Sequence, residues 1–289
     1  MKDKRHQHSG GQPLLNEIQQ ARLLQTLRTP AGDRGLWNSR KVADWMSNLL
    51  EYPVSIQRGW DYLRSLELRL KVPRPQHDLT DPKIQEVWKK KLSIRVQQIE
   101  QEYPEATVEV WGMDEHRLGL KPLIRRVWVG PGEQPIANVH CRYQWLWLYC
   151  FVHPQTGETS FWIFPKVNIE LFNRVLADFA REFKIGKDKH IILTVDQAGW
   201  HTSEQVEIPE GVHLEFIPCH SPELQPAERL WPIVNEPMAN RSFEDLDELE
   251  EVLFQRCQVI LKQPSLIKGI TSFHWWPKTR TLSFRCNRN

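Results

Sequence analysis

Three acidic residues, Asp114, Asp196 and Glu228, lie where the sequence predicts secondary-structure elements to end or begin. Asp114 follows an alternating apolar run over 106–113, which is typical of a strand. Asp196 follows the continuous apolar run Ile191–Val195, which is typical of a strand buried on both faces. Glu228 follows a Pro-rich turn and begins a predicted helix. Because sheets of this kind bind ligands at the carboxyl ends of their strands, the three carboxylates should meet if the two strands are neighbours.

Carboxylates gathered within a few ångströms repel one another, so they need a compensating positive charge. Oxygen ligands with open coordination positions favour Mg²⁺, with Mn²⁺ as a substitute. Two such ions can activate an attacking water or hydroxyl and stabilise the leaving oxyanion of a phosphodiester. The pattern therefore predicts a site with two Mg²⁺ ions. Taken singly, each acid is also explained as a helix or loop cap, so the prediction depends on the three together.

The elements that must position these acids are predicted over residues 106–264. Strands are expected over 106–114, 124–129, 144–152, 160–164, 191–196 and 212–217. Asn168 is expected to cap an amphipathic helix, and Ser242, with Asp245 three residues later, to cap the last long helix. An antiparallel hairpin region followed by α/β crossovers is the arrangement of the ribonuclease-H-like fold. The expected class is therefore α/β, a mixed sheet with flanking helices.

An all-α region is expected in front of this domain. Residues 1–38 form a polar arm and a first helix, and residues 39–72 contain two short helices joined by a tight turn. In a basic region this favours a helix-turn-helix that binds DNA, although a plain helical hairpin remains open. Base contacts are expected from Ser55, Gln57 and Arg58, and phosphate contacts from Arg64, Lys71 and Arg74.

Two further segments complete the predicted organisation. Residues 73–105 are expected to form a basic linker followed by a connecting helix, with Asp81 as its cap and Pro82 in its first turn. Residues 265–289 are expected to form a C-terminal tail.

Charge and cysteine content narrow the class of protein. Residues 1–80 hold 13 Lys and Arg against 8 Asp and Glu, which fits DNA binding at the front of a chain whose overall charge is only +2. The five cysteines have no CxxC spacing, so a disulfide framework or zinc ribbon is not expected and a reducing, cytoplasmic location is. No apolar run is long enough to span a membrane, and the polar N-terminus lacks a signal-peptide core.

Two segments resemble a known family. Residues 195–201 (VDQAGWH) and 220–231 (HSPELQPAERLW) are similar to the second and third catalytic blocks of mariner-superfamily transposases, in particular the bacterial insertion-sequence branch. The first block of that family ends a strand with an Asp-Glu pair, as Asp114 and Glu115 do here. The resemblance includes a helix-turn-helix in front of the catalytic domain.

The resemblance implies an RNase H-like core in which Asp114, Asp196 and Glu228 hold two Mg²⁺ ions. It also implies cleavage at the terminal inverted repeats of an insertion sequence, strand transfer into TA targets, double-stranded DNA as the partner, and a homodimer in the bacterial cytoplasm, associated with the nucleoid. Glu115 and Glu223 are neighbours rather than ligands by this match.

The chain also departs from the family pattern. Gln197 replaces the usual Asn, the interval between the last two acids is slightly short, and one helix-turn-helix unit is found where two are usual. The roles of His116, His201 and His220, which lie close in sequence to the acids, stay open between a supporting function and a structural one. Two other functions also stay open: a truncated or domesticated protein that binds DNA without cutting it, and a stand-alone RNase H-like nuclease.

Overall fold

The computed structural model describes residues 13–33, 35–71, 78–138 and 142–280. The chain divides into two compact units, one up to Pro75 and one from Gln76 onward. The predicted boundary at residue 105 therefore differs from the structural one, because the helix that follows Asp81 packs within the second unit.

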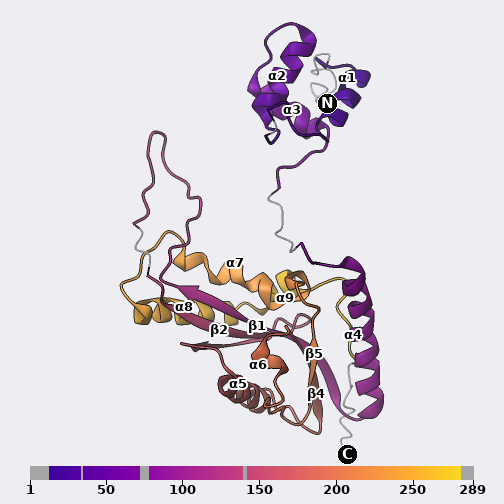
Figure 1. Ribbon diagram of the computed structural model, residues 1–289, viewed down its shortest axis with the longest axis vertical. Coiled ribbons are helices and arrows are strands. Elements are labelled where there is room, and N and C mark those ends of the chain that lie inside the picture. Colours follow the sequence, from indigo (N-terminus) through magenta and orange to yellow (C-terminus); the bar gives the residue numbers. More distant parts are fainter. Residues whose placement is uncertain (1–12, 34, 72–77, 139–141, 281–289) are drawn as a thin grey trace, which may run out of the picture. The chain divides into compact units, whose positions relative to one another are not determined.

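The first unit is helical (Figure 1) and comprises α1 (Glu17–Thr26), α2 (Ser39–Leu50) and α3 (Ile56–Ser65). Ser55 caps α3, and Asn38 accepts the capping hydrogen bond of α2, so Ser39, which the sequence offered as the cap of that helix, is not the cap. Gly59 lies where the two helices touch: an added Cβ would meet the Ser39 carbonyl oxygen at 2.1 Å. The helix pair thus requires glycine at this position.

The second unit contains a five-stranded sheet with the order β3-β2-β1-β4-β5. Its strands are β1 (Thr107–Gly119), β2 (Trp145–Val152), β3 (Thr159–Phe164), β4 (Lys189–Val195) and β5 (Val212–Phe216). β1 pairs antiparallel with β2 and parallel with β4, and β4 pairs parallel with β5. The strands that carry or precede the two predicted aspartates are therefore neighbours, which is the condition for their carboxylates to meet.

Helices cover both faces of this sheet (Figure 1). On one face α5 (Ile169–Glu182) packs against Trp111, Met113 and Phe151. On the other face α4 (Pro82–Glu102) packs near the start of β1, and α7 (Trp231–Val234), α8 (Leu246–Leu261) and α9 (Pro264–Thr271) pack near its end. Short segments complete the unit: α6 (Gly199–Thr202) and the 3₁₀ turns η1 (Pro222–Leu224), η2 (Ala227–Leu230) and η3 (Glu236–Met238). Successive residues of β1 therefore reach opposite faces.

Two strand predictions were wrong. β1 does not end at Asp114 but continues to Gly119, because its antiparallel pairing with β2 extends five residues beyond Asp114. Its parallel pairing with β4 stops at Gly112. Asp114 thus lies where β1 loses one neighbour and keeps the other. Residues 124–129 form no strand; they belong to a loop that projects from the sheet (Figure 1) and contacts the body through a bridge from Leu123 to Ala239.

Two helix predictions also need correction. Asp245 itself caps α8, accepting from the backbone N–H of Glu248, so Ser242 is not the cap. The expected C-terminal tail contains α9, whose Ile267 is fully buried, so the tail begins with a packed helix.

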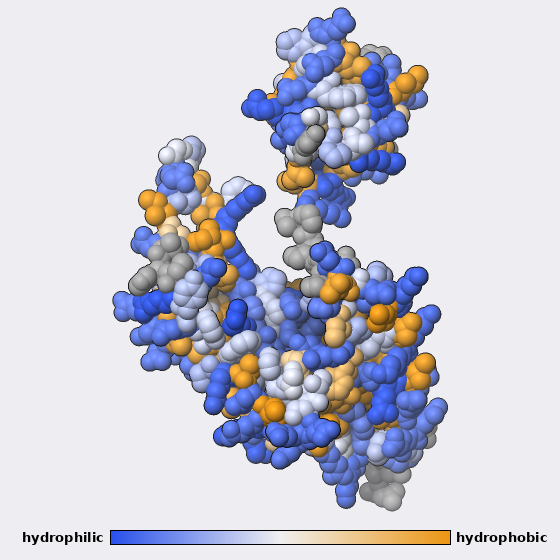
Figure 2. Space-filling model, in the orientation of Figure 1, coloured by the Kyte–Doolittle hydropathy of each residue, from blue (hydrophilic) through white to orange (hydrophobic). Residues whose placement is uncertain are grey.

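The surface of the second unit is mainly hydrophilic on the face shown in Figure 2, with hydrophobic side chains along the projecting loop. Those include Ile124, Val127 and Ile136, all exposed. Within the described residues, no helix has the length and apolar character needed to cross a membrane.

Candidate active site

A cavity of about 340 Å³ lies at the carboxyl end of β4, beside the point where β1 loses its pairing with that strand. Its walls include all three predicted acids, Asp114, Asp196 and Glu228, together with Gln225 and the turn 217–222 that follows β5. We call this cavity the acidic pocket. The sheet and the turns after it thus bring together carboxylates that are 32 to 114 positions apart in the sequence.

Asp114 enters the acidic pocket from β1. Its Oδ2 accepts a hydrogen bond of 3.3 Å from the indole N–H of Trp231 in α7. Burial raises the pKa of the Asp114 carboxyl well above its usual range, and the carboxylates of Glu228, Glu115 and Asp196 raise it further. A carboxyl in this position needs a nearby positive charge to stay ionised.

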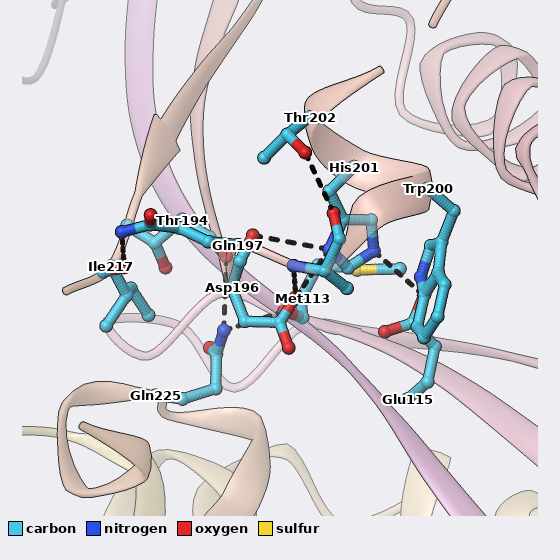
Figure 3. Close-up of polar contacts among 11 residues, drawn as sticks. Met113, Glu115, Thr194, Asp196, Gln197, Trp200, His201, Thr202, Ile217 and Gln225 are labelled. Atoms are coloured by element: carbon cyan, nitrogen blue, oxygen red, sulfur yellow. Dashed lines mark hydrogen bonds and ion pairs between the residues drawn. The ribbon is translucent and has the colours of Figure 1, made fainter. Parts of the chain in front are cut away.

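Asp196 follows β4 and is held by a chain of buried polar groups (Figure 3). His201, in α6, bonds Asp196 Oδ1 through Nδ1 at 2.6 Å and Glu115 Oε1 through Nε2 at 2.9 Å. The indole of Trp200 donates to the same Glu115 oxygen at 3.1 Å, and the backbone N–H of Ala198 donates to Asp196 at 3.0 Å. The orientation of Asp196 is therefore fixed from the opposite side of the sheet to Asp114.

These bonds set the ionisation of Asp196 and His201. Burial tends to raise the pKa of Asp196, but the hydrogen bonds from His201 and Ala198 outweigh it and lower the pKa. Burial opposes protonation of His201, yet its bonds to the two carboxylates raise its pKa to about 9. At neutral pH His201 is therefore a cation between two carboxylates, donating from both ring nitrogens.

The sequence placed Glu228 at the start of a helix; it lies in the 3₁₀ turn η2, which continues into the short helix α7 at Trp231. Burial, and then the charge of Asp196, raise the pKa of the Glu228 carboxyl. The acidic pocket thus combines two carboxyls whose ionisation is opposed with one, Asp196, whose ionisation is supported.

Gln225 attaches the turn that carries Glu228 to both strands. Its buried amide donates to the carbonyl of Met113 at 2.6 Å and to that of Thr194 at 3.2 Å (Figure 3). The turn can lie this close because position 112 is glycine: an added Cβ would meet Gln225 Oε1 at 2.5 Å and Pro226 Cδ at 2.8 Å. The side chain of Gln225 therefore attaches the turn before η2 to both β1 and β4 at the acidic pocket.

The donor set suits a hard divalent cation. It offers carboxylate oxygens only, and two of the carboxyls have raised pKa values that a cation would bring down. Among the described residues, no three His, Cys, Asp or Glu side chains already stand close enough to hold an ion. Asp196 and Asp114 are instead engaged by His201 and Trp231.

Sequence reasoning missed several residues of this site. Glu115 was set aside as a neighbour, but it is the second acceptor of His201. Trp231 and Gln225 belong to the segment 220–231, although nothing in their spacing showed which atoms they would contact. Gln197 lines the acidic pocket and donates to the carbonyl of Ile217 at 2.8 Å.

The two other histidines near the acids differ from His201. His220 lines the acidic pocket with a backbone φ of 57°, in the left-handed region. His116 stacks on Trp231, bonds Asn235 at 2.9 Å and does not line that pocket.

The residues predicted to contact DNA lie at the cap of α3, within that helix or after it. Ser55, Gln57, Arg58, Arg64 and Lys71 are exposed. Gln57 and Arg58 both reach Asp61, at 3.0 and 3.7 Å, so their side chains gather on one side of the helix. Arg74 lies outside the described residues.

Comparison with known proteins gives the family. Residues 109–250 match the family described as DDE superfamily endonuclease, and residues 33–92 match a winged helix-turn-helix family. The chain belongs to the DDE superfamily of endonucleases, with a helix-turn-helix region in front of the catalytic domain. An uncharacterized protein of Sinorhizobium fredii is 31% identical over 133 residues, which cover 45% of this chain and 97% of that protein. This relative is consistent with a bacterial insertion-sequence branch.

Solved structures of mariner transposase complexes share the fold. The Mos1 paired-end complex with Mg has a TM-score of 0.53 at 16% identity, covering 93% of this chain and 80% of that one. The pre-cleavage Mos1 transpososome has a TM-score of 0.52 at 13% identity, covering 94% and 83%. The expected RNase H-like class is confirmed, and the protein is a transposase-like DDE endonuclease.

Proposed function

We propose that this protein catalyses metal-dependent cleavage and strand transfer of DNA, with Asp114, Asp196 and Glu228 as the metal ligands. The observation that carries the proposal is the acidic pocket, in which the three carboxylates share one cavity at the carboxyl end of β4, beside β1. The raised pKa values of Asp114 and Glu228 support it, because these carboxyls lack a compensating charge.

The chain's own residues would hold and orient the reacting groups. His201, fixed by Glu115, keeps the carboxylate of Asp196 ionised and directed, and Gln225 keeps the Glu228 turn against both strands. Two Mg²⁺ ions, when bound, would polarise the attacking water or hydroxyl and neutralise the leaving oxyanion.

The finer parts of the proposal concern the DNA and the assembly. We propose that the protein acts in the bacterial cytoplasm, at the nucleoid, on the terminal inverted repeats of an insertion sequence and inserts them at TA targets as a homodimer. Ser55, Gln57 and Arg58 would contact bases, while Arg64, Lys71 and Arg74 would contact phosphates. The exposed positions of the first five of these side chains support this assignment.

The test is cleavage of a labelled duplex carrying the element's end by the full chain, in Mg²⁺ and in Ca²⁺. Wild type should cut in Mg²⁺, and Asp196→Asn should not. Asp188→Asn is the matched control, because Asp188 is exposed at the opposite end of β4 and should leave the rate unchanged. Equal cleavage by Asp196→Asn and wild type would remove Asp196 from the site. Joined products with a TA-containing target distinguish a transposase from a stand-alone nuclease.

A second candidate is a protein that binds DNA without cutting it. It is favoured by the contacts that already engage two of the acids, since Asp196 bonds His201 and Asp114 bonds Trp231. Tight binding of duplex DNA with no cleavage by wild type in Mg²⁺ or Mn²⁺ would select this candidate over the first.

A further inference from the structure

A second cavity, of about 470 Å³, opens beside the acidic pocket at the far end of β1. Three segments form it: the end of β1 with the start of the projecting loop, the returning segment before β2, and the chain from Asn235 to Phe243. Its floor is apolar, formed by the buried side chains of Leu118, Leu120, Met238 and Phe243. The cavity thus has an apolar floor near the end of β1.

Several cationic side chains surround this apolar floor. Lys121, Arg142 and Arg241 line the cavity, and no Asp or Glu is found among its described lining residues. The Nε of Arg142 is buried and has no hydrogen-bond partner in the described part of the chain. Arg241 makes a long ion pair with Glu248, at 3.5 Å, and its guanidinium lies over the ring of Phe243, 4.9 Å from the ring centre. A buried cationic donor without an acceptor is costly, so this cavity is suited to an anionic ligand. We call this cavity the basic pocket.

The two pockets are linked through β1 and Trp231. Asp114 and His116 are alternate residues of β1 and so point to the same face of the sheet. Trp231 connects them, because its indole donates to Asp114 and its ring stacks on His116 at 4.7 Å. His116 lines the basic pocket. From Asp114 to the end of β1 at Gly119 the strand rises about 17 Å, which equals about five base pairs along B-DNA.

We propose that the basic pocket binds the phosphate backbone of DNA next to the bond held in the acidic pocket. The proposal rests on the proposed function, because a DNA strand engaged at the three carboxylates supplies the polyanion. The neighbouring phosphates of that strand would pair with Arg142, Lys121 and Arg241, while its deoxyribose rings pack on the apolar floor of the pocket. A DNA backbone fits this combination of cations above an apolar surface better than a free inorganic anion does, because a small anion would leave the apolar floor uncovered.

The test measures DNA affinity rather than cleavage. Lys121→Gln, Arg142→Gln and Arg241→Gln are each made in the full chain on an Asp196→Asn background, so that no DNA is cut. Lys262→Gln, which changes an exposed cation at the end of α8 outside the pocket, is the matched control. Binding of a random-sequence duplex is followed by fluorescence anisotropy at several salt concentrations, and thermal melting confirms that each variant is folded.

Each pocket variant should bind roughly three- to tenfold more weakly, because it loses one charge-assisted contact. The slope of log affinity against log salt should fall by about 0.9 per phosphate contact removed. Lys262→Gln should change neither quantity. If all three pocket variants match Lys262→Gln, the proposal is overturned even when wild type cleaves DNA. If wild type cuts no DNA but the slopes fall as expected, the proposed catalytic function fails and the basic pocket stands.

Discussion

The acidic and basic pockets lie side by side on one face of the sheet, yet they are built differently. In the acidic pocket, Asp196 and Asp114 are held by His201 and Trp231, and Gln225 braces the strands beneath them. In the basic pocket, Lys121 and Arg241 are exposed, and Arg142 Nε has no partner among the described residues. A compact divalent ion requires oxygens fixed within a few tenths of an ångström, whereas a diffuse polyanion requires only mobile positive charge.

This difference predicts that the acidic pocket is intolerant of substitution, and Glu228→Gln should show the largest effect. An amide keeps the shape of the side chain but removes the negative charge that would bind a divalent cation. Cleavage should slow by about a thousandfold or more, in the range seen when a transition-state-stabilising group is lost. Single-turnover cleavage in Mg²⁺ measures this, with exposed Glu210→Gln as the control. Comparable rates for the two variants would show that Glu228 is not a ligand.

A smaller effect is expected when a brace beneath the ligands is removed. Gln225→Leu leaves the carbonyls of Met113 and Thr194 without their shared donor. Cleavage should fall roughly 10–100-fold, and the Mg²⁺ concentration for half-maximal rate should rise, because outer groups orient the ligands. The free energy of unfolding should fall by about 1–3 kcal/mol. A loss of stability with an unchanged Mg²⁺ dependence would limit Gln225 to a structural role.

The acidic pocket should also carry a cost in stability. The raised pKa of Asp114 means that the folded state disfavours its charged form. A carboxyl of this kind destabilises the metal-free protein as pH rises through its folded-state pKa. Asp114→Asn should therefore raise the metal-free melting temperature by about 2–4 °C at neutral pH, for a gain of about 1 kcal/mol. The gain should shrink at acidic pH or when Mg²⁺ stabilises the wild type. A lower melting temperature for Asp114→Asn at all pH values would contradict this electrostatic account.

The smallest effect is expected for stability at the basic pocket. Lys121 is exposed, and its side chain has no ion pair or hydrogen bond within the described part of the chain, so Lys121→Gln should change the free energy of unfolding by less than about 0.5 kcal/mol. Thermal melting without DNA measures this, with Lys262→Gln as the reference. Surface substitutions usually change stability by no more than about 0.5 kcal/mol. A loss of about 2 kcal/mol or more would therefore mean that Lys121 is a structural residue.

The sequence predicted those parts of the fold that depend on local pattern. The run before Asp196 is a buried central strand, and Asn168 caps α5, because apolar runs and caps act over a few residues. The end of β1 was misplaced because it depends on pairing with β2, which is remote in the chain. The segment 124–129 has a strand-like composition but finds no partner strand among the described residues, so it remains a loop.

The site was predictable to a similar depth. The three acids were found from their positions after predicted strands and a turn, together with the family resemblance. The contacts of Gln225 and Glu115 join segments about 30 to 110 positions apart, so no local pattern reports them. The same holds for the basic pocket, where Arg142 and Arg241 come from segments about 100 positions apart. Long-range contacts of this kind require the folded chain.

The most direct test of the central claim is the location of the metal. Crystals of the full chain grown with Mn²⁺, a substitute for Mg²⁺ with a measurable anomalous signal, should show anomalous density in the acidic pocket, bounded by Asp114, Asp196 and Glu228. The same crystals of Asp196→Asn should show weaker density or none. Full Mn²⁺ density elsewhere in the molecule, with none among these three carboxylates, would contradict the account.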